Sequence, residues 1–315
     1  MSFHIYGQAE KNPLPKFSKN SKKDSPELYT PSKGLVDAVN VALALGQPLL
    51  LTGEPGTGKT QLAKHVAWYF DLGEPLVFNA QTTSTATDLF FRYDALGHFH
   101  FSQNNKNPEG LTNDQVEENF IRYQALGKAI KTKERRVVLI DEIDKAPRDL
   151  PNDVLAAIEA LEFTVPQIGK SFKSDNDHRP IIIMTSNSEK NLPDAFLRRV
   201  VYYHIDFPNA NTLLKILENK VDGFSTGNLK SIIKHFEHIR NHRTIKLKKN
   251  PATAELIFWT MLLNKIGFDA NKLDDYKSLP EADKEQLFTS YSVLAKTKED
   301  LSAMRELLFG KKRKN

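Results

Sequence analysis

Cysteine is absent from this sequence of 315 residues. Its absence excludes disulfide bonds, zinc sites made of thiolates and cysteine nucleophiles. It also fits a reducing compartment, and we expect a cytoplasmic protein. The N-terminal segment MSFHIYGQAEKNP lacks a basic stretch followed by an apolar one, so we expect no secretory signal peptide.

Long apolar runs are missing as well. No stretch approaches the roughly 18–20 apolar residues that a membrane-spanning helix requires, so we expect no membrane span. Hydrophobic residues make up 40% of the chain and charged residues 26%, and the mean hydropathy is −0.46. This composition is typical of a soluble protein with a packed core, and the length allows one large domain or two ordinary ones.

Acidic residues are fewer than basic ones, which gives a formal net charge of +5 and a pI near 9.0. Much of the excess lies in short runs at 16–23, 131–136 and 243–249, and in the C-terminal KKRKN. Such runs can follow a phosphate backbone. No nucleic-acid-reading motif or aromatic interleaving accompanies them, so a solvated surface is the simpler interpretation and nucleic-acid binding is a weakly supported alternative.

The composition changes twice along the chain. Residues 1–28 are polar and rich in lysine, which predicts a flexible N-terminal arm. In residues 29–208, apolar runs alternate with helical patterns, which predicts an α/β fold: an αβα sandwich around a five-stranded parallel sheet. Residues 209–315 show mainly helical patterns, and we expect a separate all-helical lid domain with a basic tail. The expected strands lie at residues 49–52, 75–81, 136–142, 181–187 and 200–207.

The stretch LLLTGEPGTGKTQLAKHVA, residues 49–67, contains the strongest motif. Eight of its residues match GxxxxGK[ST] in full, between an apolar strand and a predicted helix. The glycines let successive backbone N–H groups surround phosphate oxygens, and the helix start adds its positive dipole end. The lysine is expected to reach the β- and γ-phosphates of ATP, and the final threonine to bind Mg²⁺. The predicted nucleotide-binding residues are Gly53, Glu54, Pro55, Gly56, Thr57, Gly58, Lys59 and Thr60.

Two adjacent carboxylates end the apolar strand RVVLIDE, residues 136–142. Asp141 is expected to hold Mg²⁺ through water beside Thr60. Glu142, one residue further on, is placed to polarise the attacking water as a general base. A small-molecule kinase with the same loop does not need this base, so the pair favours ATP hydrolysis. The simpler alternative for Glu142 is an ordinary exposed acid at a strand end.

Polar side chains also accompany the next two strands. Asn187 ends the strand IIIMTSN, and because ligands gather at the carboxyl ends of parallel strands, its amide is expected to orient water or touch the γ-phosphate. Arg198 and Arg199 precede the last strand. Guanidinium groups suit the charge of a transferring phosphoryl group, but the order of elements directs these two away from their own nucleotide. We expect them to complete a neighbour's site in trans within a ring, the alternative being a surface ion pair.

Together these motifs resemble those of AAA+ ATPases, and within them the MoxR-like group, over about residues 30–300. The resemblance includes the phosphate loop, VVLIDEIDKAP, the TSN sensor segment and LPDAFLRR. It implies a hexameric ring that uses ATP and Mg²⁺ to remodel protein partners, often partners with a von Willebrand factor A domain. It also implies an insert near residues 88–101, a hairpin at 163–180, and Arg199 as the trans arginine with Arg198 as second choice.

One feature of that family is missing. The lid usually carries an arginine that senses the γ-phosphate, but the corresponding turn here, KKNPATAE, has none, and Lys248 or Lys249 is the expected substitute. Two further hypotheses remain open. One is an ATP-gated switch or scaffold with slow turnover, and the other is a nucleic-acid-associated motor or loader.

Two clusters of side chains have no assigned role. His235, His238 and His242 fall on one face of a predicted helix, which suits a solvated or partner-contacting face better than a metal site. The aromatic residues between Phe90 and Phe101 fit a substrate-gripping loop and a packed cluster equally well.

Overall fold

The computed structural model describes residues 22, 25–104, 111–132, 134–242 and 245–310. The chain forms two compact units. The first, the sheet unit, comprises residues 31–53 and 58–205. The second, the helical unit, comprises residues 54–57 and 206 onward, together with the residues up to 30. Most of the expected N-terminal arm and the end of the basic tail lie outside the described residues.

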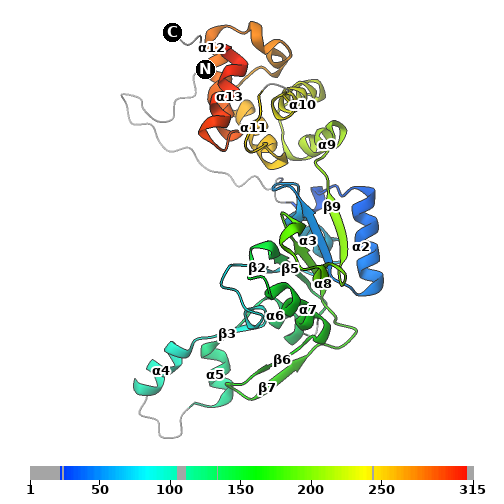
Figure 1. Cartoon of the computed structure of the whole chain (residues 1–315), viewed down its shortest axis with the longest axis vertical. Helices are drawn as coiled ribbons and strands as arrows, with labels where there is room; N and C mark the ends of the chain where they lie inside the picture. Colours follow the sequence, from blue (N-terminus) through cyan, green and yellow to red (C-terminus); the bar gives the residue numbers. More distant parts are fainter. Residues whose placement is uncertain (1–21, 23–24, 105–110, 133, 243–244, 311–315) are drawn as a thin grey trace. The chain divides into compact units, whose positions relative to one another are not determined.

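Five parallel strands form the centre of the sheet unit (Figure 1). Their order, β2-β5-β8-β1-β9, places the first strand of the chain between β8 and β9. The three inner strands are almost wholly buried, as strands covered on both faces must be. The expected five-stranded parallel sheet in an α/β fold is therefore confirmed. The strands are β1 (Leu49–Gly53), β2 (Leu76–Asn79), β5 (Val137–Asp141), β8 (Ile181–Thr185) and β9 (Val201–Ile205).

Helices cover this sheet. α3 packs on β1, β5 and β8, α2 packs on β1 and β9, and α6 packs on β2 and β5. α2 begins after Ser32, whose hydroxyl accepts the Leu35 N–H, and it ends at Gly46, whose φ of 61° suits glycine at a helix C-terminus. Five of this unit's helices are α2 (Lys33–Leu45), α3 (Lys59–Tyr69), α6 (Ala125–Lys131), α7 (Leu150–Ala160) and α8 (Asp194–Leu197).

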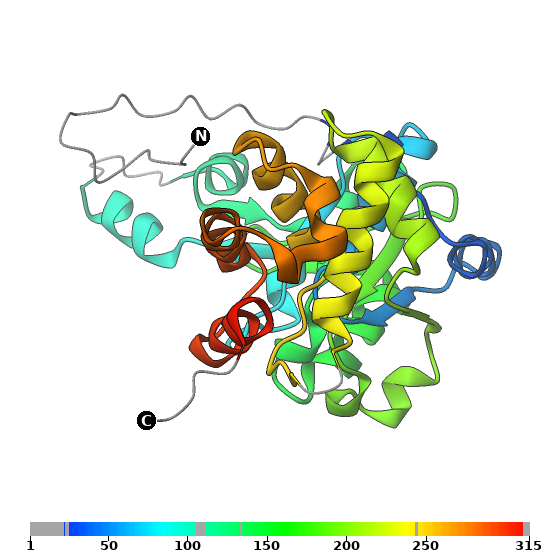
Figure 2. The ribbon, with the colours of Figure 1, turned by 90° about the horizontal axis from the view of Figure 1, so that it is seen from above.

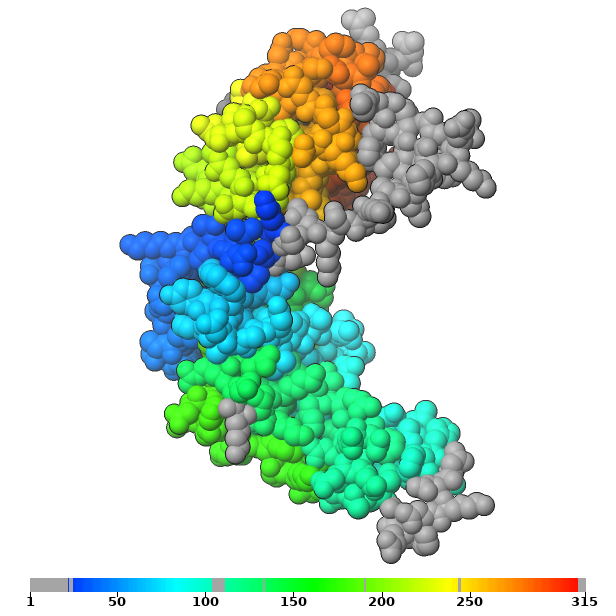
Figure 3. Space-filling model, turned by 180° about the vertical axis from the view of Figure 1, so that it is seen from behind, coloured from blue at the N-terminus to red at the C-terminus, as the bar shows by residue number. Residues whose placement is uncertain are grey.

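Two antiparallel excursions project from the five-stranded sheet within the sheet unit (Figure 1). Figure 3 shows the surface of this part of the chain in cyan and green. Strands β3 and β4 pair and carry α4 and α5 between them, and β6 and β7 form a hairpin before β8. The ring of Phe163 in the hairpin stacks on Phe90, with centroids 4.9 Å apart, so the excursions share an aromatic cluster. Their elements are β3 (Phe91–Tyr93), α4 (Ala95–Asn104), α5 (Asn113–Phe120), β4 (Ile121–Tyr123), β6 (Glu162–Val165) and β7 (Lys170–Lys173).

The aromatic residues between Phe90 and Phe101 divide into two groups. Phe90 and Phe91 are buried in the core, whereas Phe99 is 57% exposed and Phe101 42% exposed. The division arises because the chain turns from strand to helix after Asp94, whose carboxylate accepts the Gly97 N–H at 2.8 Å. Packing thus accounts for the first group, and the second lies on the surface of α4.

The helical unit has a core of its own, and its helices are drawn from yellow-green to red in Figure 2. Trp259, Tyr291 and Phe236 are fully buried in it. Polar caps start its helices: the side chains of Asn209 and Ser225 accept backbone N–H groups of α9 and α10. The elements are α9 (Ala210–Lys220), α10 (Thr226–Arg240), α11 (Thr253–Lys265), η5 (Ala270–Ser278), α12 (Glu281–Ser290), η6 (Tyr291–Val293) and α13 (Lys298–Phe309).

The histidine face of α10 corrects one expectation. His235 is only 3% exposed, and its Nε2 lies 2.5 Å from the Tyr291 hydroxyl. Burial lowers the pKa of His235 to about 3. The expected solvated or partner-contacting face is therefore wrong for His235, because helical spacing does not show which face the core covers. The described residues contain no group of three side chains suited to hold a metal ion, and none of their helices is long and apolar enough to cross a membrane.

Candidate functional site

The phosphate loop joins the carboxyl end of β1 to the start of α3. Gly56 and Gly58 have φ values of 78° and 91°, which side chains disfavour, and they turn the backbone before α3 begins at Lys59. α3 has 11 residues, so a full helix dipole begins at this loop. The local geometry is therefore that of an anion-binding helix N-terminus, as the motif predicts.

Lys59 lies inside the loop with only 8% of its surface exposed. Its ammonium group donates to the Gly53 carbonyl oxygen at 2.8 Å and to Asn187 Oδ1 at 3.0 Å. Burial lowers the pKa of Lys59, while the carboxylates of Asp141, Asp144 and Glu142 oppose that shift. Three nearby negative charges thus favour the protonated lysine that phosphate binding requires.

Asp141 is linked to two hydroxyl groups from neighbouring elements. The Thr60 hydroxyl lies 3.3 Å from Asp141 Oδ1, and the Thr185 hydroxyl also donates to that oxygen. Thr185 in turn accepts the backbone N–H of Glu142 at 2.9 Å. Thr185, which the sequence analysis did not single out, therefore fixes both the Asp141 side chain and the Glu142 backbone.

Glu142 follows β5 in a left-handed conformation, with φ of 57°. Such a conformation is unusual for a residue with a side chain and occurs often at functional sites. Asn187 Nδ2 lies 3.5 Å from Glu142 Oε1, and the Asn187 N–H donates to Asp144 Oδ1 at 3.2 Å. Lys145 forms an ion pair with Glu142, and that hydrogen bond raises the pKa of Lys145.

Arg198 and Arg199 lie at the opposite end of the sheet. In the pairing of β1 with β9, Leu49 lies beside Val201 and Gly53 beside Ile205. The arginines precede Val201, so the length of the ladder, about 13 Å at 3.3 Å per residue, separates their backbone from the phosphate loop. Both are exposed, and neither side chain forms an ion pair or hydrogen bond with the described residues. The structure does not bring them together with the other predicted site residues.

The outer turn of the phosphate loop, residues 54–57, groups with the helical unit. Within that unit the Arg240 side chain is 7% exposed and pairs with the Glu54 carboxylate at 2.5 Å. Arg240 also donates to the Pro251 carbonyl oxygen at 2.7 Å. Lys248, one of the two lysines expected to substitute for the missing lid arginine, instead lies 3.6 Å from Glu299, and its side chain is 64% exposed. The same expectation for Lys249 stays a prediction. Arg240 is thus a lid cation that contacts this turn, and sequence reasoning missed it.

The donor set at the carboxyl edge fits a metal–triphosphate. The Thr60 hydroxyl and the Asp141 carboxylate are hard oxygen ligands of the kind that Mg²⁺ prefers, and they lie side by side. Lys59 and the backbone of residues 53–60 provide the positive groups that phosphate oxygens need. Glu142 and Asn187 place a carboxylate and an amide next to the same space.

The family model of the AAA domain (dynein-related subfamily) matches residues 48–200. The gas vesicle ATPase GvpN of Haloferax mediterranei is 27% identical over 214 residues, which is 65% of this chain and 60% of that protein. Spastin of Sus scrofa is 29% identical over 174 residues, 54% of this chain and 23% of spastin. A solved structure of Thermotoga maritima RuvB aligns with a TM-score of 0.44 and 16% identity over 83% of this chain and 74% of that one.

The family model and the similarity to the gas vesicle ATPase support an AAA+ ATPase domain over residues 48–200. The chain spans less than two thirds of the gas vesicle ATPase and about a quarter of spastin. The resemblance to the MoxR-like group remains a prediction.

Proposed function

We propose that this protein is a Mg²⁺-dependent ATPase that works as an oligomeric ring and remodels protein partners. One observation carries the proposal: Lys59, Thr60, Asp141, Glu142 and Asn187 meet at one edge of the sheet through direct hydrogen bonds. The AAA-domain match over residues 48–200 supports it independently. A phosphate loop alone would not separate an ATPase from a kinase, but Glu142 beside Asn187 favours hydrolysis.

Each residue has a role in this proposal. Lys59 exchanges its contacts with Gly53 and Asn187 for oxygens of the β- and γ-phosphates. Thr60 and Asp141 hold Mg²⁺, which, when bound with ATP, neutralises charge on the phosphate oxygens. Glu142 would accept a proton from the water that attacks the γ-phosphorus, as the bond to the bridging oxygen breaks and ADP leaves, and Asn187 would orient that water.

Arg199, with Arg198 as second choice, is proposed to act on the nucleotide of a neighbouring subunit. The support is their exposure, their lack of described partners and their position at the edge opposite the phosphate loop. A residue that serves the next subunit requires head-to-tail contacts, and such contacts close into a ring when the rotation allows. We propose a hexamer, as the resemblance to MoxR-like proteins implies.

The partner is proposed to be a cytoplasmic protein, with a von Willebrand factor A domain as the first class to test. An ATP-gated switch with slow turnover is a second candidate, and one observation favours it. Glu142 is ion-paired with Lys145, so the proposed base is engaged by a cation in this structure. Hydrolysis that a partner stimulates many-fold would favour remodelling over the switch. A nucleic-acid motor, supported only by the basic runs, is excluded if DNA and RNA leave the ATPase rate unchanged at low salt.

The Glu142→Gln variant tests the assignment. We expect ATP affinity within about threefold of wild type and turnover reduced by at least a hundredfold, because the amide cannot accept the proton. Nucleotide binding by calorimetry and phosphate release together measure this. Sedimentation with Mg-ATP is expected to show a ring in the same variant. Undiminished hydrolysis would remove Glu142 from the mechanism, and a monomer in every nucleotide state would remove the trans arginine.

A further inference from the structure

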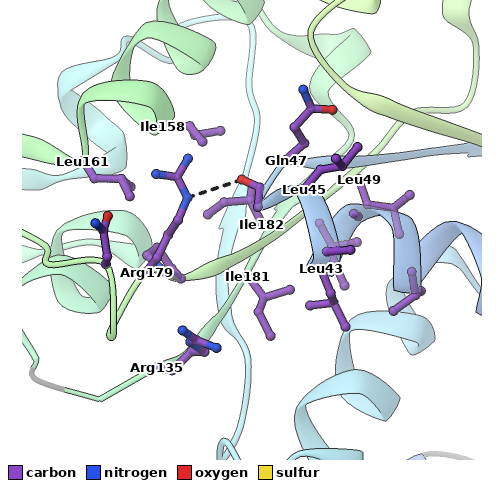
Figure 4. A pocket seen from close by; sticks show the side chains of 17 residues that line it. Leu43, Leu45, Gln47, Leu49, Arg135, Ile158, Leu161, Arg179, Ile181 and Ile182 are labelled. Atoms are coloured by element: carbon purple, nitrogen blue, oxygen red, sulfur yellow. Dashed lines mark hydrogen bonds between the residues drawn. The ribbon is translucent and has the colours of Figure 1, made fainter.

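A pocket opens at the amino edge of the sheet, where β1 and β8 begin (Figure 4). Its volume is about 310 Å³, which falls within the range of small-molecule sites, about 300–1,000 Å³. All of its lining residues belong to the sheet unit. None of them takes part in the nucleotide site at the carboxyl edge.

The floor of this pocket is apolar. Its side chains come from α2, β1, α7 with the residue that follows it, and β8, and each is at most 6% exposed. They are Ala42, Leu49, Ile158, Leu161 and Ile182. A hydrocarbon group that enters the pocket therefore leaves water and packs against apolar side chains, which is favourable.

Two arginines line one side of the pocket. Figure 4 shows Arg135 and Arg179 on the side opposite Leu45 and Leu49. Arg179 Nε donates to the Gly46 carbonyl oxygen at 3.3 Å. Arg135 donates to the Asp177 carbonyl oxygen at 3.0 Å.

The charge of these arginines is not balanced within the pocket. Each guanidinium has five N–H donors, and each donates one hydrogen bond to a backbone carbonyl oxygen among the described residues. No aspartate or glutamate of the described part of the chain lines the pocket. Neither arginine forms an ion pair with a carboxylate of the described residues. The pocket therefore combines cationic and aliphatic side chains, and Ile158 and Leu161 of the apolar floor lie next to Arg179 (Figure 4).

We propose that this pocket binds a small organic anion: a carboxylate joined to a branched or aromatic hydrocarbon body. The carboxylate pairs with guanidinium donors of Arg135 and Arg179, which suit planar oxygen pairs. The hydrocarbon body covers the apolar floor. An inorganic anion lacks the apolar part, and a neutral molecule leaves the arginines without a charged partner.

Arg179 also has a structural role, because it lies at the C-terminal end of α2 and bonds to Gly46. A cation there stabilises the helix dipole. That role accounts for one bond of Arg179. It does not account for Arg135 or for the open apolar floor.

Calorimetric titration of the full chain tests the proposal, with benzoate and 3-methylbutanoate as probes and benzamide and inorganic phosphate as comparators. We expect one site per chain for each acid, at least about tenfold tighter than benzamide because only the acids form charge-assisted hydrogen bonds. Phosphate is expected to compete weakly or not at all with benzoate.

Variants locate the site. Arg135→Met is expected to weaken benzoate binding about tenfold and to leave benzamide unchanged. Arg148→Met, an exposed arginine outside the pocket, is the matched control and is expected to bind like wild type. Ala42→Phe fills the pocket and is expected to abolish binding. If that core variant fails to fold, the Arg135→Met variant still tests the proposal. Arg135 is exposed, so its substitution is expected to leave the fold intact.

Three results would overturn the proposal. The first is equal affinity for the acid and its amide. The second is benzoate binding that Arg135→Met leaves unchanged. The third is no detectable binding of either acid up to about 10 mM, the weak end of specific affinities. Each of these is independent of ATP hydrolysis and so does not bear on the proposed function.

Discussion

The two edges of the same sheet differ in whether their polar side chains form hydrogen bonds within the protein. At the carboxyl edge, Lys59, Asp141, Thr185 and Asn187 bond to one another or to the Glu142 backbone. At the amino edge, the side chains of Arg198 and Arg199 bond to none of the described residues. Both edges belong to one unit, so the difference reflects side chains and strand direction and not separate domains.

Strand direction explains the contrast. In a parallel sheet the loops after the strands meet at one edge, together with the starts of the helices that follow. The positive ends of these helices attract hydrogen-bond acceptors and anions to that edge. The amino edge receives the chain before each strand, and here that chain carries arginines. The hydrogen-bonded carboxyl edge is suited to catalysis. The amino edge, where the side chains of Arg198 and Arg199 bond to none of the described residues, is suited to contact with another molecule.

Substitution of Lys59 at the carboxyl edge is expected to have the largest effect on ATP binding and turnover. Lys59→Ala removes the ammonium group that bonds both Gly53 and Asn187. We expect ATP affinity to fall at least a hundredfold and turnover to become undetectable. Lys64→Ala, a lysine further along the same helix, is the control. Binding of ATP by the Lys59 variant with near-normal affinity would contradict the proposed role of the loop.

Substitution of the arginines at the amino edge is expected to have the next largest effect on turnover. Arg199→Ala is expected to reduce turnover about a thousandfold while ATP binding stays within threefold, as for an arginine that stabilises a transferring phosphoryl group. Arg198→Ala is expected to have a smaller effect. Steady-state phosphate release and nucleotide titration separate the two parameters. A larger defect in Arg198→Ala than in Arg199→Ala would exchange their roles.

Thr185 tests whether the carboxyl edge depends on its internal bonds. Thr185→Val keeps the shape of a residue that is 1% exposed but removes the hydroxyl between Asp141 and the Glu142 N–H. We expect a 10–100-fold loss in kcat from misplacement of the base, with little change in ATP affinity. Thr185→Ser restores the hydroxyl and is expected to restore most of the rate. A Val variant with normal turnover would show that the bonds are not needed.

Glu117 lies away from both edges. Its substitution is expected to have the smallest effect, and that effect is on the stability of the fold. Hydrogen bonds from Lys131 and Lys170 hold the pKa of Glu117 at about 2, against 4.5 for an unperturbed glutamate. Because the folded pKa is depressed, the stabilisation is complete above about pH 4.5 and is lost as pH falls toward 2.

The Glu117→Gln variant measures that stabilisation. We expect it to lower the free energy of unfolding at pH 7 by about 1–3 kcal/mol and to weaken the loss of stability between pH 4.5 and 2. ATP turnover per folded molecule is expected to stay normal. Glu118→Gln, an exposed neighbour, is the control. Identical pH profiles of Tm for the wild type and Glu117→Gln would contradict this assignment.

The sequence was sufficient for the sheet because its inner strands are covered on both faces and so consist of continuous apolar runs. Residues directly after those runs, such as Asp141, Glu142 and Asn187, follow from the strand ends. Thr185 could not be found in this way. Its bond to Asp141 depends on the register of β5 and β8, in which Ile140 lies beside Met184. Register is a tertiary property, and a threonine in a buried strand carries no local signal.

Contacts between distant segments escaped prediction for a related reason. Arg240 and Glu54 are separated by 186 positions, and nothing near either residue indicates the pair. Arg135 belongs to the basic run 131–136, which by sequence looked like solvated surface. Its place in a pocket depends on residues contributed by four other elements. Candidate catalytic residues at strand ends can thus be predicted from the sequence. Side-chain contacts between distant elements cannot.

The central claim is that Glu142 and Arg199 of different subunits complete one active site. Mixing two inactive variants, Glu142→Gln and Arg199→Ala, tests it most directly. A site is intact when an Arg199→Ala subunit receives Arg199 from a Glu142→Gln neighbour, so random assembly of equal amounts is expected to restore about a quarter of the wild-type rate. Absence of any recovery, although co-purification shows mixed oligomers, would contradict a site shared between subunits.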